Sequence, residues 1–352
     1  YRTLLNTLND IDVRSDADPG VWQLPDGRDY YAAVLRHHLT LDMSPDEVPQ
    51  LGLDNVERLR TEVSNALSEM GYDVAGLGFA GAVVEARDDS GAFTLGTEEN
   101  RNAVLLETEA HIAAGADAFS AMFTGLPDAE LQVKRPRAGR EGDTGAWYRA
   151  PSAYGDRPGI YYLNLGGQEK EQQTWATTNY HEAIPGHHFQ LAIQRESAEL
   201  PLLQRSVVFT GYAEGWGLYA ERLAFEAGLY ADDPQGNIGR LRMELLRASR
   251  VVVDTGIHHH EWTYDEALAY MLDLGFPEGM SLSEIDRYVV WPGQAPAYLI
   301  GMLEILRVRQ MAMDALGDDF DIAAFHDEVL RHGSLPLAAL EPVVDRFIEQ
   351  YG

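Results

Sequence analysis

Cysteine is absent from this chain of 352 residues, and lysine occurs only twice, at Lys134 and Lys170. Without cysteine the chain forms no disulfide and no thiolate zinc site, and it has no cysteine nucleophile. Any metal ion must therefore be held by His, Asp and Glu side chains.

Positive charge is scarce as well. The chain has 27 Lys and Arg residues against 56 Asp and Glu residues, which gives a net charge of -29. Such a surface repels nucleic acid and anionic membranes, so we expect no nucleic-acid partner. Salt adaptation, genome composition or a cationic partner would each explain the acidity, which therefore identifies no substrate.

Long apolar runs are also missing. The run VAGLGFAGAVV at residues 74–84 is too short to cross a bilayer. We expect no membrane span and a soluble protein, and the sequence leaves open whether it is cytoplasmic or exported.

The periodicity of apolar residues indicates a mainly α (α+β) fold. Between about residues 129 and 166, the short runs LQVKRP, AWYRAPS and GIYYLNL predict a small antiparallel sheet. After Gly167 the pattern predicts helices at about 171–197, 206–228, 235–257, 263–274, 281–290, 296–316, 320–332 and 336–350. We expect a helical N-terminal region at 1–128 and a second region at 129–352, packed together as one unit.

The stretch NYHEAIPGHHFQ at residues 179–190 resembles an interrupted zinc motif. In HExxH, two His residues one helical turn apart bind zinc, and the Glu between them is the general base. Here Pro185 occupies the place of the second His. In a straight helix His187 would point about 120° away from His181.

Pro185 itself provides a way to restore the site. Proline cannot donate to the carbonyl four residues earlier, and its ring forces the helix to kink. Gly186 then permits the backbone detour. We predict a deviation at residues 183–187 that brings His187 to the metal beside His181, with His188 as the alternative second ligand.

A third ligand is expected on the next helix, because catalytic zinc takes three protein ligands. Within GYAEGWGLYAERL at 211–223, Glu214 and Glu221 are seven residues apart and lie on nearly the same face. The segment EGWGLYAE resembles NEGF-x-x-Y-x-E of the zinc aminopeptidases related to leukotriene hydrolase. That resemblance implies that Glu214 is the third metal ligand.

A longer resemblance covers the chain from about residue 27 to its end. The segments PGIYYLNL, HEAIPGHHFQ, EGWGLYAE, DTGIHHHEWTYDEA, GQAPAYLIGMLEILRVR and FHDEVLRHGSLPL resemble the bacterial family called domain of unknown function 885, which is gluzincin-like. It implies a zincin-like metallopeptidase fold and one zinc ion bound by His181, His187 and Glu214, with Glu182 as the base. Members are typically longer at the N-terminus, so we expect a segment to precede Tyr1.

Other residues are weaker candidates for the same site. Glu221 either supports a ligating His through its other ring nitrogen or forms a surface salt bridge. Arg250, Asp254 and His258 recur every four residues and form a polar stripe, which we expect to line a cavity. His258 would then stabilise the oxyanion, Arg250 would bind a substrate carboxylate, and Asp254 would support the site.

Two further features complete the expected site. Tyr298 begins a long helix, and its phenol is a candidate oxyanion donor of the kind that gluzincins use. The strand GIYYLNL precedes the zinc motif, and Tyr162 and Asn164 on it are candidates for binding peptide by strand addition.

Together these features predict a zinc-dependent metallopeptidase with a peptide substrate. A zinc hydrolase of another amide or ester uses the same water chemistry, and a catalytically silent binding protein of the same fold is the alternative from another class. A di-iron carboxylate bundle would need Glu-x-x-His on two helices plus two further Glu residues. We do not find that set.

Overall fold

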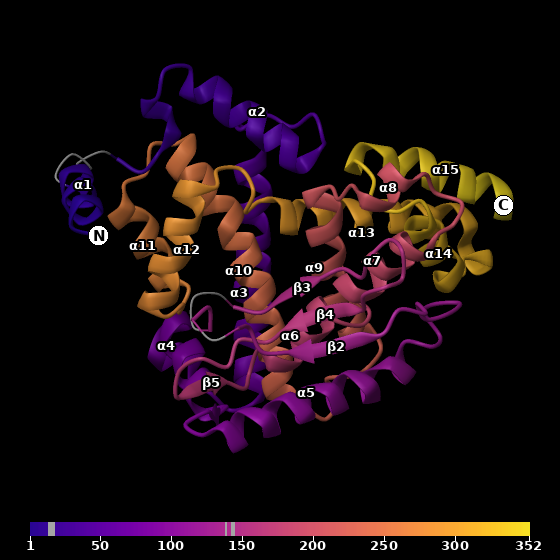
Figure 1. Ribbon diagram of the computed structural model, residues 1–352, viewed down its shortest axis with the longest axis horizontal. Helices are drawn as coiled ribbons and strands as arrows, with labels where there is room; N and C mark the ends of the chain where they lie inside the picture. The colour runs from indigo at the N-terminus through magenta and orange to yellow at the C-terminus, as the bar shows by residue number, and fades with distance from the viewer. Residues whose placement is uncertain (13–17, 138, 142–144) are drawn as a thin grey trace.

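The computed structural model describes residues 1–12, 18–137, 139–141 and 145–352 and consists mainly of helices (Figure 1). This confirms the predicted mainly α class. The helices are α1 Arg2–Asp12, α2 Gly27–Leu39, α3 Val48–Glu69, α4 Val74–Asp89, α5 Glu98–Ala118, α6 Trp175–Glu182, α7 His187–Glu196, α8 Leu202–Ser206, α9 Thr210–Glu226, α10 Pro234–His258, α11 Tyr264–Asp273, α12 Glu278–Val290, α13 Ala297–Leu316, α14 Ile322–Arg331 and α15 Leu340–Tyr351. Short 3-10 helices lie at Val21–Gln23, Gly317–Asp319 and Leu337–Ala339.

A small three-stranded sheet lies before the zinc-motif helix, as expected, but its pairing differs from the prediction. Its strands β2 (Leu131–Lys134), β3 (Trp147–Arg149) and β4 (Gly159–Tyr162) are ordered β2-β4-β3. The β3–β4 pair is antiparallel, whereas β2 and β4 are parallel. The sheet is mixed because β4 inserts between the two earlier strands. A separate antiparallel pair joins β1 (Ala92–Thr94) and β5 (Glu169–Glu171).

Two helix pairs form the centre of the molecule, α3 with α10 and α9 with α13. The second pair approaches very closely, because glycines face each other at the crossing. A Cβ on Gly301 would lie 1.9 Å from the Gly211 carbonyl oxygen and 2.8 Å from the Cα of Gly215. This contact places the start of α13, which carries Tyr298, beside the part of α9 that carries Glu214.

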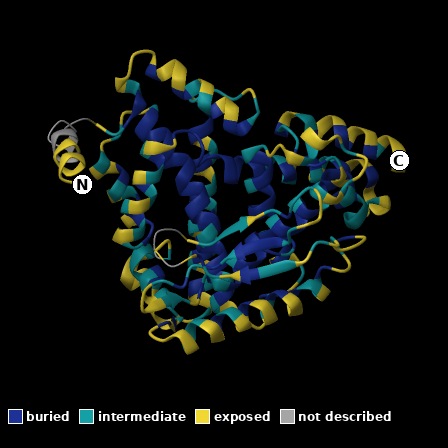
Figure 2. Ribbon diagram, in the orientation of Figure 1, coloured by how far each residue is buried: buried dark blue, intermediate teal, exposed yellow. Residues whose placement is uncertain are grey.

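The core is continuous across most of the chain. One cluster of buried side chains extends from Val21 to Phe347 and includes residues of both predicted regions. A smaller cluster, which includes Phe93, Ile112 and Tyr161, fills the space between the sheet and α5. Figure 2 shows α9 and α10 almost entirely buried and the outer face of α5 exposed. The boundary near residue 128 stays a prediction.

Within the part of the chain that the structure describes, no helix is both long enough and apolar enough to cross a membrane.

The glycine contact between α9 and α13 is testable by adding one methyl group. Gly301→Ala is expected to lower the free energy of unfolding by about 3 kcal/mol, because the added Cβ meets backbone atoms that cannot rotate away. Gly279→Ala, at an exposed position of α12, has open space around its Cβ. That control should change stability by less than about 1 kcal/mol, and in the stabilising direction. Equal effects of the two variants in chemical denaturation would contradict the assigned packing.

Candidate metal centre

The zinc-motif helix is interrupted where the sequence predicts it. Helix α6 ends at Glu182 and α7 begins at His187. Between them Ala183 leaves the helical region, with φ -106° and ψ -109°, and the Ile184–Pro185 peptide bond is cis. The predicted deviation at residues 183–187 is confirmed. Its form is a complete break between two helices rather than a bulge within one.

Two contacts stabilise the backbone conformation at this break. A Cβ on residue 186 would lie 1.9 Å from the carbonyl oxygen of His181, so only glycine allows the chain to fold back onto the end of α6. From the neighbouring helix α9, the Trp216 indole Nε1 donates to the Pro185 carbonyl oxygen at 2.8 Å. The break is therefore held by backbone contact on one side and by a buried indole on the other.

The break brings three potential ligands together. His181 lies in the last turn of α6, His187 is the first residue of α7, and Glu214 lies near the start of α9. Glu214 Oε2 is 3.3 Å from His187 Nε2 and 3.6 Å from His181 Nε2. The three ligand atoms lie within 4.8 Å of one another. Two imidazoles and one carboxylate form a donor set that suits zinc and leaves a coordination position for water.

Glu182 lies close enough to His181, His187 and Glu214 to feel their charges, and its Oε2 has no hydrogen-bond partner among the described residues. Its side chain is buried, and burial raises the pKa of its carboxyl group. The pKa of Glu214, in contrast, is lowered. Burial opposes its ionisation, but contact with His181 and His187 holds its pKa well below the usual range. The two carboxyl groups are therefore electrostatically distinct, as a base and a ligand need to be.

Glu221 lies directly behind His181. His181 Nδ1 donates to Glu221 Oε1 at 2.8 Å, and Thr177 and Arg247 also contact this buried carboxylate. A proton fixed on Nδ1 leaves the lone pair of Nε2 directed at the ligand group, which is how carboxylates commonly orient a metal-binding His. Of the two alternatives for Glu221, the structure shows a buried carboxylate in contact with His181 rather than a surface salt bridge, and its role in supporting a metal ligand stays a prediction.

Tyr298 also reaches the group. Its ring lies nearly parallel to that of His181, with centroids 6.2 Å apart and an interplanar angle of 22°. The guanidinium of Arg250 lies 4.6 Å from the Tyr298 ring centroid, and those of Arg247 and Arg287 lie within 5.8 Å. Arg287 Nη2 donates to the Tyr298 hydroxyl at 3.1 Å.

The sequence predicts that Arg250 binds a substrate carboxylate, whereas the structure shows its guanidinium paired with a carboxylate of the protein itself. Its guanidinium forms two hydrogen bonds with Glu284, at 2.7 and 2.9 Å, and the side chain is buried. A bidentate ion pair of this kind satisfies the charge within the protein. Glu284 lies on α12, 34 residues away, so the helical periodicity of α10 did not indicate it.

His258 and Asp254 also differ from the expectation, because both form hydrogen bonds with neighbouring segments of the fold. His258 Nδ1 accepts from the Val21 amide and its Nε2 donates to the Tyr288 carbonyl, so neither nitrogen is available for an oxyanion. Burial lowers the pKa of His258 to about 4, which keeps the ring neutral. Asp254 accepts from the Tyr31 hydroxyl and the Gly293 amide. Both side chains fasten α10 to neighbouring segments and contact none of the three ligands.

The strand residues are likewise placed differently from the expectation. Tyr162 belongs to β4, the central strand, both of whose edges are already paired, and its ring stacks on Trp147. Asn164 accepts from the Gly166 amide through Oδ1. Strand addition at β4 is therefore excluded, and β3 is the edge strand on that side of the sheet.

His188, the alternative second ligand, is turned toward the sheet. Its Nδ1 lies 2.9 Å from the Tyr148 hydroxyl, and it is packed beside Gly159. His187, and not His188, belongs to the group that could hold a metal ion.

Sequence reasoning overlooked Trp216 and Arg287. Trp216 stands beside Glu214 in EGWG, where a buried donor next to a helix break could have been suspected. Arg287 has no sequence signal, because it reaches Tyr298 across the turn between α12 and α13.

Comparison with known proteins identifies a family but no activity. Residues 1–344 match the family described as bacterial protein of unknown function (DUF885). The crystal structure of a candidate lipoprotein from Colwellia psychrerythraea has a TM-score of 0.93 at 34% identity and is matched over 99% of this chain and 60% of that one. No curated protein matches the chain.

A second solved structure shares the fold. It is a candidate lipoprotein of unknown function from Shewanella oneidensis, with a TM-score of 0.79 at 20% identity, matched over 97% of this chain and 63% of that one. The chain thus spans about three-fifths of the length of either neighbour. By the match over residues 1–344, the chain belongs to the DUF885 family of bacterial proteins.

Proposed function

We propose that this protein is a zinc-dependent metallopeptidase of the gluzincin type. One observation carries the proposal: His181, His187 and Glu214 face one another, with the unpartnered carboxylate of Glu182 beside them. Zinc bound by such a group would lower the pKa of a water molecule and polarise a substrate carbonyl. Peptides are the proposed substrates. Because the structure that is 34% identical is described as a candidate lipoprotein, we also propose an exported location for this chain.

Glu182 is the proposed general base. A buried carboxylate oxygen without a hydrogen-bond partner, such as Glu182 Oε2, is unfavourable for folding, so a role in proton transfer is a better account of it than a purely structural one. Glu182 follows His181 directly at the end of α6. It would accept the proton of the attacking water and return it to the leaving amine.

Tyr298 is the proposed oxyanion donor. Its hydroxyl oxygen already accepts from Arg287. Its own proton has no acceptor in the described part of the chain. Donation from an arginine polarises a phenol, so that the hydroxyl becomes a stronger donor. The peptide backbone would pair with the edge strand β3 rather than with β4.

Arg287 is the proposed binding group for a substrate carboxylate, in place of Arg250. Its Nη2 donates to Gln294 and to Tyr298, and it has no carboxylate within ion-pairing distance among the described residues. Arg247 is paired with the buried Glu221, and Arg250 is paired with the partly buried Glu284. A partly exposed, unpaired guanidinium next to the proposed oxyanion donor suits a peptide whose free C-terminus lies close to the scissile bond.

Glu182→Gln tests the catalytic assignment. The variant should bind one equivalent of zinc, as the wild type does, but hydrolyse peptides at least about 100-fold more slowly, because the amide cannot accept the proton. Metal analysis and cleavage of a peptide library with a chelator control measure the two properties. Glu199→Gln, at an exposed site, should retain full activity.

Two outcomes would count against this account. Zinc-loaded wild type that cleaves neither peptides nor model esters would favour the silent binding protein, and ester cleavage alone would favour a non-peptide hydrolase.

Arg287→Met tests the carboxylate site. On matched peptides with a free C-terminus or a C-terminal amide, the wild type should prefer the free acid by about tenfold or more in kcat/KM, because one charge-assisted contact is lost with the amide. The variant should lose this preference, and exposed Arg36→Met should keep it. An unchanged acid-to-amide ratio in Arg287→Met would show that the carboxylate is bound elsewhere or not at all.

A further inference from the structure

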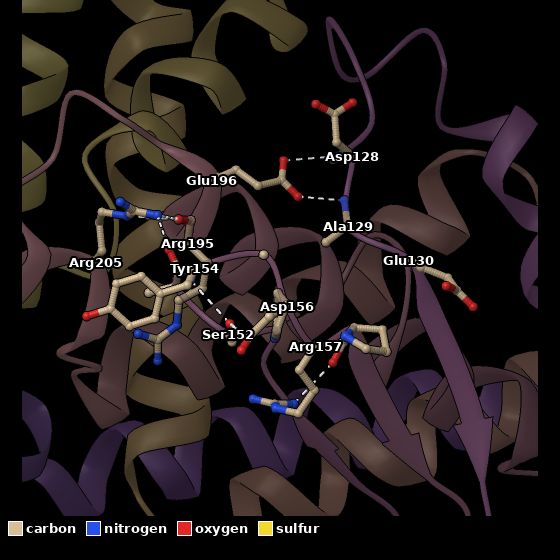
Figure 3. A pocket seen from close by; sticks show the side chains of 14 residues that line it. Asp128, Ala129, Glu130, Ser152, Tyr154, Asp156, Arg157, Arg195, Glu196 and Arg205 are labelled. Carbon is tan, nitrogen blue, oxygen red and sulfur yellow. Dashed lines mark hydrogen bonds between the residues drawn. The ribbon is translucent and has the colours of Figure 1, made fainter.

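A cavity of about 580 Å³ lies away from the metal ligands, at the C-terminal end of α7. The loop between β3 and β4, the segment before β2 and Arg205 near the end of α8 surround it (Figure 3). None of its lining residues belongs to the metal ligand group. Arg195 is eight residues beyond His187 on α7, which is about 12 Å along the helix axis.

Three arginines line this cavity, Arg157, Arg195 and Arg205. Arg157 donates to the carbonyl oxygens of Ala150 and Pro158, and Arg205 donates to those of Ala153 and Arg195. Arg195 Nε is buried and has no hydrogen-bond partner among the residues described. Backbone carbonyls therefore orient two of the guanidinium groups without neutralising their charge.

Four acidic residues also line this cavity, Asp128, Glu130, Asp156 and Glu196, and the last three accept hydrogen bonds from groups other than the arginines, Glu130 from the Gln132 amide. Glu196 accepts from the backbone amides of Asp128 and Ala129 at 3.0 and 2.6 Å, which turns it away from the arginines (Figure 3). Asp156 accepts from Ser152. Over the described ranges, no carboxylate lies within 4.0 Å of any of the three guanidinium groups. In a chain with twice as many acidic as basic residues, such an unpaired group is unexpected.

The three charges also repel one another. Burial lowers the pKa of Arg195, and the neighbouring charges of Arg157 and Arg205 lower it further. An anion between the three groups would relieve this repulsion and fill the hydrogen-bonding positions that remain. Tyr154, 80% exposed, stands beside Arg195 and Arg205 at the opening of the cavity (Figure 3).

We propose that this cavity is a binding site for an anionic group with several oxygens, a phosphate or a carboxylate, held by Arg157, Arg195 and Arg205. Planar guanidinium groups bind both kinds of anion through paired N–H donors. The anion has two possible sources, free inorganic phosphate and the terminal carboxylate of a peptide. The proposal is independent of the proposed hydrolysis, so its test does not use activity.

Isothermal titration of the full, metal-free chain tests the site. The probes are inorganic phosphate, N-acetyl-glycylglycine and the amide of that dipeptide, each at matched ionic strength in chloride. Wild type should bind phosphate or the dipeptide acid saturably at one site, and the tighter of the two identifies the source. Arg195→Met should weaken this binding by about tenfold or more, because it removes charge-assisted donors and keeps the aliphatic contacts.

Two further variants serve as controls. Arg36→Met changes the net charge equally at an exposed position and should bind like wild type. Arg195→Lys keeps the charge without the planar fork, so it should bind with intermediate affinity, and it provides the test if Arg195→Met does not fold as judged by circular dichroism. Absence of saturable binding of either anion to wild type would overturn the proposal. Unchanged affinity in the folded Arg195 variants would overturn it equally.

Discussion

The candidate site depends on the docking of α9 against the break between α6 and α7. Trp216 holds the Pro185 carbonyl, while Glu214 and Glu221 of the same helix contact His187 and His181. These contacts fix the relative positions of two short helices that would otherwise be joined only by residues 183–186. Because α9 is in turn pressed against α13 through facing glycines, the position of Tyr298 follows from the same arrangement.

Around this arrangement most buried charges are paired within the protein. Glu221 contacts His181 and Arg247, and Arg250 pairs with Glu284. Isolated buried charges are strongly unfavourable, so such pairs are needed if polar groups are to surround a site in the centre of the fold. Glu182 and Arg287 differ from these groups, because among the described residues Glu182 Oε2 has no hydrogen-bond partner and Arg287 has no carboxylate within 4.0 Å. The proposed chemistry uses these two groups.

Local sequence patterns predicted the parts of the fold that local chemistry determines. Apolar periodicity predicted the helices. The missing N–H and the ring of Pro185 predicted the break that allows His181 and His187, six residues apart, to face Glu214. Periodicity on α10 correctly indicated a polar stripe but not what the stripe would contact. Arg250 forms an ion pair with Glu284, and His258 forms hydrogen bonds with Val21 and Tyr288. All three partners are distant in the sequence. The parallel β2–β4 pair escaped prediction for the same reason, since strand order is set by tertiary packing.

The central claim is that His181, His187 and Glu214 hold a metal ion, and zinc titration of the metal-free protein tests it most directly. Calorimetry should give one tightly bound zinc per chain in the wild type and in His37→Ala, which alters an exposed histidine. His187→Ala and Glu214→Gln should each lose at least about 100-fold in zinc affinity, because each removes a direct ligand and the loss of a supporting residue alone costs 10- to 100-fold. No zinc binding by the wild type, or binding undiminished in these two variants, would contradict the account.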